Sequence, residues 1–92
     1  MKEYNGHRSY NAWNVSLWLG GDEYYYDIVS DKIKITKLYW RELISKEEQI
    51  KKATDIIFNR LNYYKLEKTP DGAYFNRLSI KLFVEDMFDH ID

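Results

Sequence analysis

The side chains of this sequence that could act as acids, bases, nucleophiles or metal ligands are few and scattered. There are two histidines, His7 and His90, and no cysteines, which excludes a disulfide framework, a thiolate nucleophile and a zinc–thiolate site. Carboxylates such as Glu47 and Glu48 are paired as sequence neighbours, and neighbours on a helix diverge by about 100° rather than share a site. No nucleophile elbow, P-loop or dinucleotide-binding glycine pattern occurs, although a Ser/His/Asp triad assembled in space stays open. We therefore expect a protein that is not an enzyme and that uses no metal and no cofactor.

Aromatic and charged residues point instead to recognition of another macromolecule. Tyr39 and Trp40 lie among four cations: Lys32, Lys34, Lys37 and Arg41. Such a mixture can contact phosphates while bases stack on the rings, or the rings can simply complete the core. Three consecutive tyrosines at positions 24–26 cannot all face the core of a helix, and exposed tyrosines are frequent interface anchors. The candidate partner-binding residues are Tyr24, Tyr26, Tyr39, Trp40, Arg41, Glu85, Asp86 and Asp89.

Charge is segregated along the chain although the net charge is only −1. Residues 1–31 and 69–92 each carry a net charge of −3, and residues 32–68 carry +5. The basic middle could pair with the acidic ends inside the fold, or the two signs could form separate patches for partners. An acidic surface containing Glu85, Asp86 and Asp89 could in that case mimic a nucleic acid.

Local signals place a helix at each side of Asp22 in the first third of the chain. Its 92 residues allow a single domain with one core. Ser9 is a good N-cap for a helix over Tyr10–Leu19, which Gly20-Gly21 end. Apolar residues fall on two opposite faces of that helix, which predicts a central position in the core. Asp22 can cap a second, short helix that ends near Ser30-Asp31.

The middle of the chain is ambiguous between strand and helix. Ile33 and Ile35 alternate with lysines, so we expect an extended or irregular piece over Lys32–Thr36, with pairing to Ala73–Asn76 as one option. A helical turn then runs from about Thr36 to Ile44.

Two amphipathic helices are predicted in the second half. Ser45 and Glu48 form a capping box ahead of a helical stripe of apolar residues: Ile50, Ala53, Ile57, Leu61 and Tyr64. Thr69–Gly72 is a turn signal, and Ser79 is expected to cap a last helix that reaches Ile91. The fold class is therefore mainly α, a compact small domain of about four helices, with a short β element near Lys32–Thr36.

Asn11 and Asn14 lie among large apolar side chains, on the same strip of the first helix as Trp18. A buried amide without a partner is costly. The two asparagines therefore either bond to neighbouring backbone, for instance the Tyr4–Gly6 loop, or form a recognition surface. We expect the first.

The same segment resembles a motif found in small, mostly uncharacterised proteins of bacteriophages and prokaryotic viruses, of the form YNG-x-x-NYETWNVALWI-x-ND. The matching stretches are Tyr4–Gly6, Tyr10–Leu19 and Gly21-Asp22, and a TPDG turn before an amphipathic helix matches Thr69–Gly72. The chain departs from the motif at residues 7–9 and at Gly20. The motif residues expected to be structural are Asn5, Gly6, Tyr10, Asn11, Trp13, Asn14, Trp18 and Asp22.

The resemblance implies an accessory protein of a virus or mobile element that works inside a bacterial or archaeal cell. It brings no established activity, but proteins of this class often inhibit host defence, including CRISPR effectors, by occupying a partner's surface. We therefore expect a host protein or ribonucleoprotein complex as the partner; a nucleic-acid-binding regulator using Lys32–Arg41 is the alternative.

The sequence also predicts a cytoplasmic protein that does not enter a membrane. No apolar run approaches the roughly 18 residues that span a bilayer. The opening residues MKEYNGHRS lack the apolar core of a signal peptide. The sequence does not indicate an oligomeric state.

Overall fold

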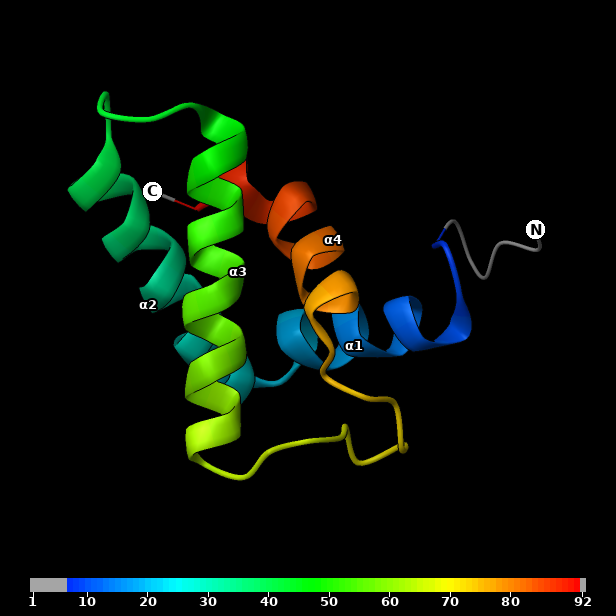
Figure 1. Cartoon of the computed structure of the whole chain (residues 1–92). Helices are drawn as coiled ribbons and strands as arrows, with labels where there is room; N and C mark the ends of the chain where they lie inside the picture. Colours follow the sequence, from blue (N-terminus) through cyan, green and yellow to red (C-terminus); the bar gives the residue numbers. More distant parts are fainter. Residues whose placement is uncertain (1–6, 92) are drawn as a thin grey trace.

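The computed structural model describes residues 7–91, which form four α-helices and a short 3-10 turn (Figure 1). The helices are α1 (Tyr10–Gly21), α2 (Glu23–Trp40), α3 (Lys46–Tyr63) and α4 (Arg77–Met87), followed by η1 (Phe88–His90). The predicted mainly α fold with about four helices is confirmed.

Three of the helices begin where a short polar side chain was expected to cap them. Ser9 Oγ accepts a hydrogen bond from the amide of Ala12, Asp22 accepts from the amides of Tyr24 and Tyr25, and Ser45 accepts from the amide of Glu48. Each cap satisfies amides that have no partner within the first turn of a helix.

The fourth helix starts three residues earlier than predicted. Asn76, not Ser79, is its N-cap, because Asn76 Oδ1 accepts from the amide of Ser79 at 2.9 Å. Ser79 lies buried in the first turn, where its hydroxyl oxygen accepts a hydrogen bond from Asn11.

The predicted break and extended piece in the middle of the chain are wrong, because α2 runs without interruption through Ser30-Asp31 and Lys32–Thr36. The buried side chains of Tyr25, Val29, Ile33 and Thr36 follow one another at helical spacing. Ile35 points to solvent, so its alternation with Ile33 reflects two helix faces rather than a strand.

The two segments predicted to follow or to pair with that extended piece also differ from the prediction. α2 ends at Trp40, and a turn rather than a helix leads through Ile44 to α3. Tyr74 makes an isolated antiparallel bridge with Lys68 and none with Lys32–Thr36.

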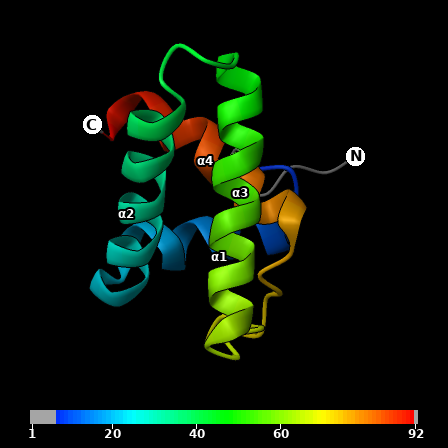
Figure 2. The same ribbon diagram turned by 60° about the vertical axis from the view of Figure 1, so that its left-hand side comes forward.

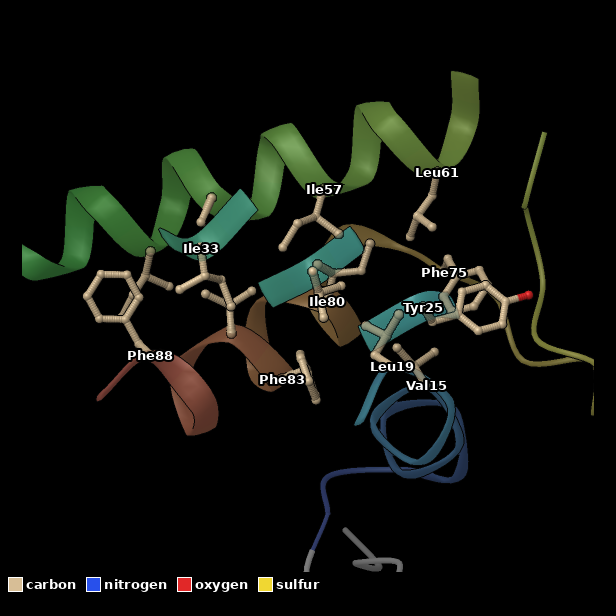
Figure 3. Packing of buried hydrophobic residues seen from close by; sticks show 14 of the residues in the cluster. Val15, Leu19, Tyr25, Ile33, Ile57, Leu61, Phe75, Ile80, Phe83 and Phe88 are labelled. Atoms are coloured by element: carbon tan, nitrogen blue, oxygen red, sulfur yellow. The ribbon is translucent and has the colours of Figure 1, made fainter. Parts of the chain in front are cut away.

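The helices pack in a ring in which α1 contacts α2 and α4, and α3 contacts the same two helices. α2 and α3 lie side by side (Figure 2). Side chains from all four helices and from the 64–76 loop point into one core (Figure 3). The stripe predicted for α3 is buried at Ile50, Ala53, Ile57 and Leu61, whereas Tyr64 is exposed.

α1 is buried on one side rather than on two. Ala12, Val15 and Leu19 are buried, while Leu17 on the opposite side is exposed. Gly20 and Gly21 belong to the helix instead of ending it. A Cβ atom on Gly20 would lie 3.3 Å from Cε1 of Phe83, so the missing side chain lets α1 approach α4 closely.

Candidate functional site

Asn11 ties α1 to the loop before α4. Its amide nitrogen donates to the carbonyl oxygen of Tyr74 at 2.9 Å and to Ser79 Oγ at 2.8 Å. Its amide oxygen accepts from the backbone N–H of Tyr74 at 2.8 Å. The side chain therefore satisfies both backbone groups of Tyr74, as a neighbouring strand would.

Asn14 and Trp18 hold the turn at residues 69–72. Both side chains donate to Oδ2 of Asp71 at 2.9 Å. Thr69 donates its hydroxyl to the amide oxygen of Asn14 at 2.6 Å, and the same hydroxyl accepts from the amide of Ala73 at 3.0 Å. We call this network the α1 clasp, formed by Asn11, Asn14, Trp18, Thr69, Asp71 and Tyr74.

The α1 clasp answers the question raised by the two asparagines. Both amides have partners inside the fold, but these are not neighbouring backbone groups as expected. Asn14 bonds to the side chains of Thr69 and Asp71. Asn11 bonds to the backbone of Tyr74 and to Ser79 Oγ, more than 60 residues away. The loop proposed as their partner, with the motif residues Asn5 and Gly6, lies outside the described residues. Trp13 and Tyr10 pair their rings at 5.8 Å, and Asp22 caps α2. The described motif residues named here therefore all make contacts within the protein.

The carboxylate of Asp71 gives the α1 clasp a pH dependence. Hydrogen bonds from Asn14 and then Trp18 hold the pKa of Asp71 below its usual range. Because the pKa of Asp71 is lower in the folded state, its carboxylate stabilises the fold at pH values above the unfolded-state pKa. This stabilisation is lost as the pH falls through the folded-state pKa.

We expect Asp71→Asn to flatten the loss of stability measured by urea unfolding between pH 5 and pH 2. Asp86→Asn, an exposed carboxylate, controls for the loss of one charge. An unchanged acid slope in Asp71→Asn would contradict this assignment.

A row of apolar side chains is exposed at the C-terminal end of α2. On α2, Leu38 is 73% exposed and Tyr39 71%, and Ile35 lies one turn earlier on the same side. Leu43, 73% exposed, lies in the turn after the helix. We call these four residues the α2 face. On a helix that packs only against a core, such positions are normally polar.

Cations border the α2 face on one side. Lys34, Lys37 and Arg41 follow at helical spacing and, with Leu38 and Gln49, line a groove of about 460 Å³. Lys37 is engaged, because its ammonium donates to the carbonyl oxygens of Phe88 and Ile91 at 2.7 and 2.6 Å. Figures 1 and 2 show the C-terminal segment beside this end of α2. Within residues 7–91, Lys34 and Arg41 have no ion pair.

The predicted aromatic candidates divide into exposed and engaged side chains. Tyr39 is exposed, whereas Trp40 is half-buried and carries the ammonium of Lys52 over its ring at 4.5 Å. Tyr24 is exposed beside α3, and Tyr26 packs against the core. Of the tyrosine and tryptophan candidates, only Tyr39 lies on the α2 face, where Arg41 is close by along the chain.

The acidic candidates lie elsewhere and are partly neutralised. Asp89 accepts from Lys46 at 2.6 Å, and that hydrogen bond lowers the pKa of Asp89. Glu85 lies 3.8 Å from Lys81. Asp86 is exposed. The basic middle therefore pairs in part with the acidic end, as one of the two charge interpretations expected.

Ile35, Leu38 and Leu43 were absent from the predicted site. The signal for Ile35 and Leu38 is the spacing 35, 38 and 39, which becomes visible only when α2 is continued through Trp40. Leu43 lies in the turn after the helix, where helical spacing gives no signal. Over the part of the chain described here, no three His, Asp or Glu side chains are arranged to hold a metal. Nor does any helix in that part combine the length and apolar character needed to cross a bilayer.

Fold and site together define a small α-helical domain braced by buried amides, with an apolar and basic surface at one end of α2. The chain belongs to a family of unknown function, DUF7249, whose family model matches residues 1–92. No curated protein and no solved structure matches the chain.

Proposed function

We propose that this protein is a non-enzymatic binding protein that occupies the surface of a host macromolecule. The observation that carries the proposal is the α2 face, where Leu38, Tyr39 and Leu43 are each more than 70% exposed. Contiguous exposed apolar side chains rimmed by charge are typical of interaction sites in soluble proteins. The hydrogen bonds of the α1 clasp support a structural role for the motif residues, and we therefore take the α2 face as the candidate surface.

The setting of this function follows from the resemblance to small viral accessory proteins, and it is an analogy at the level of a protein class. We propose that the partner is a protein or ribonucleoprotein component of a bacterial or archaeal defence system, such as a CRISPR effector. The protein would then act in the cytoplasm of the host cell and inhibit by covering a working surface.

Binding of nucleic acid is the second candidate, because Lys34 and Arg41 are unpaired within residues 7–91 and Tyr39 is exposed beside them. A mobility shift at low salt tests it, since phosphate contacts are strongest there. Retarded DNA or RNA whose affinity falls steeply with added salt would support this candidate, and no shift would exclude it.

The main proposal is tested by affinity capture with the full chain. Tagged protein is incubated with lysates of several prokaryotes, and bound proteins are identified by mass spectrometry. We expect one partner in stoichiometric amount from at least one lysate. Recovery of no stoichiometric partner from any of them would count against the proposal.

A further inference from the structure

We infer that the α2 face docks an acidic amphipathic helix of a partner protein. This inference rests on the proposed function and names the chemistry of the partner at the same site. Helix-in-groove recognition uses apolar anchors at helical spacing on the incoming segment, with charged residues along its edges. The α2 face presents the complementary arrangement.

The apolar part of the surface is mainly aliphatic. Ile35 and Leu38 lie one turn apart on α2, Tyr39 follows Leu38, and Leu43 is exposed in the turn after the helix. Three of these four side chains are aliphatic, and covering them would remove apolar surface from water, which favours docking of an apolar helix face.

The charge at the border of this surface selects an acidic partner. Lys34 and Arg41 are unpaired within residues 7–91 and lie on the same flank of α2. The carboxylates near the α2 face are Asp31, which is paired with Lys32 at 3.2 Å, and Glu42, which lies in the turn after α2 and has no ion pair within residues 7–91. The two unpaired cations outnumber this one carboxylate, so a carboxylate-rich helix is favoured over a lysine-rich helix.

The contacts around the basic stripe disfavour nucleic acid as the occupant. Lys37 is committed to the carbonyl oxygens of Phe88 and Ile91, and Lys52 already covers the ring of Trp40. Lys34, Arg41 and the exposed ring of Tyr39 remain, and that ring already packs against Trp40 at 5.4 Å between centroids. Single-strand binding relies instead on several stacked bases along a charged groove.

The acidic end of α4 does not offer the matching face on a second copy of this chain. Its exposed acids, Glu85 and Asp86, flank the side chains of Phe83, Val84 and Phe88, which are buried in the protein's own core. Among the residues that line the groove with Glu85, Leu78 is the one exposed large apolar side chain. A single leucine does not match the apolar row on α2, so we favour a different protein as the occupant.

The test titrates designed helical peptides into the isotopically labelled full chain while backbone amide NMR shifts are recorded. One peptide carries leucines at i, i+3, i+4 and i+7 with glutamates at its edges. A second replaces the glutamates with lysines, and a third scrambles the first. A single-stranded and a double-stranded oligonucleotide complete the set.

We expect the acidic peptide to shift amides over residues 34–43 and to bind at least tenfold more tightly than the lysine and scrambled peptides. Leu38→Asp and Arg41→Glu should each weaken it about tenfold, and Arg41→Lys should largely preserve binding. Leu78→Asp is the matched control, because Leu78 is an exposed leucine on α4 that lines a different groove. It should leave the affinity unchanged.

The inference would be overturned by absent or non-preferential binding of the acidic peptide, or by shifts centred on the groove around Leu78. Tighter binding of either oligonucleotide, or shifts of residues 34–43 that arise from raising the protein concentration alone, would also overturn it. The result of the peptide titration can be distinguished from the result of lysate capture. If the peptides fail while capture succeeds and Leu38→Asp abolishes it, the acidic-helix inference is wrong and the proposed function stands. If capture fails in every lysate, the proposed function loses its support whatever the peptides do.

Discussion

Asn14→Ala is expected to lower the free energy of unfolding by about 1–3 kcal/mol, the range for leaving buried polar partners unsatisfied. Asn14 is 1% exposed. It donates to Asp71 and accepts from Thr69, so its removal strands a buried hydroxyl and frees the turn before α4. In a domain of this size, each kcal/mol corresponds to a fall in Tm of roughly 4–8 °C.

Thermal and urea unfolding followed by far-UV circular dichroism measure this effect. Asn59→Ala is the matched control, because Asn59 is exposed on α3 and alanine has the higher helix propensity. The control should be as stable as the wild type or slightly more stable. A wild-type Tm in Asn14→Ala would mean that the α1 clasp does not brace the fold.

Leu38→Asp is expected to reduce capture of the partner at least tenfold, a change of about 1.4 kcal/mol or more in binding free energy. The substitution places a carboxylate at the centre of the α2 face, where docking would remove it from water beside the partner's own acids. Because Leu38 is 73% exposed, the fold should lose no more than a few tenths of a kcal/mol.

Quantitative capture with equal amounts of folded bait checks this prediction. Leu78→Asp introduces the same charge at another exposed leucine, 51% exposed in the first turn of α4, and should capture the partner as well as the wild type does. If Leu38→Asp captures as much partner as the wild type, or if only Leu78→Asp loses capture, the α2 face is not the binding surface.

The starts of the first three helices were predictable from a few adjacent residues, whereas Asn76 rather than Ser79 caps the fourth. Ser9, Asp22 and Ser45 cap helices because their oxygens reach amides two or three positions ahead. α3 was predicted from a stripe that stays apolar over several turns. The extended piece at residues 32–36 was wrong because five residues fit a period of two as well as they fit a helix, and only the longer row from Tyr25 to Thr36 separates them.

The α1 clasp was only half predictable. Satisfaction of Asn11 and Asn14 follows from the cost of burying a free amide. Their partners, Asp71 and Tyr74, were not predictable because no local rule links positions that lie 57 and 63 residues apart. The resemblance offered one clue, because two of its matching stretches, Tyr10–Leu19 and Thr69–Gly72, are hydrogen-bonded to each other.

The motif and the candidate surface involve different side chains. The described motif residues hold α1 against the 69–74 turn, while the α2 face carries exposed leucines. Substitutions at Leu38, Tyr39 or Leu43 are therefore expected to change partner binding with little effect on the fold. Substitutions in the α1 clasp are expected to lower stability.

Site-specific photo-crosslinking in a host lysate separates the two candidate surfaces in one measurement. A photoreactive amino acid is placed at position 38 in one sample and at position 78 in another, and crosslinked products are identified by mass spectrometry. If the α2 face is the binding surface, a single partner crosslinks strongly from position 38 and not from position 78. Crosslinking of that partner from position 78, with none from position 38, would contradict this assignment of the binding surface.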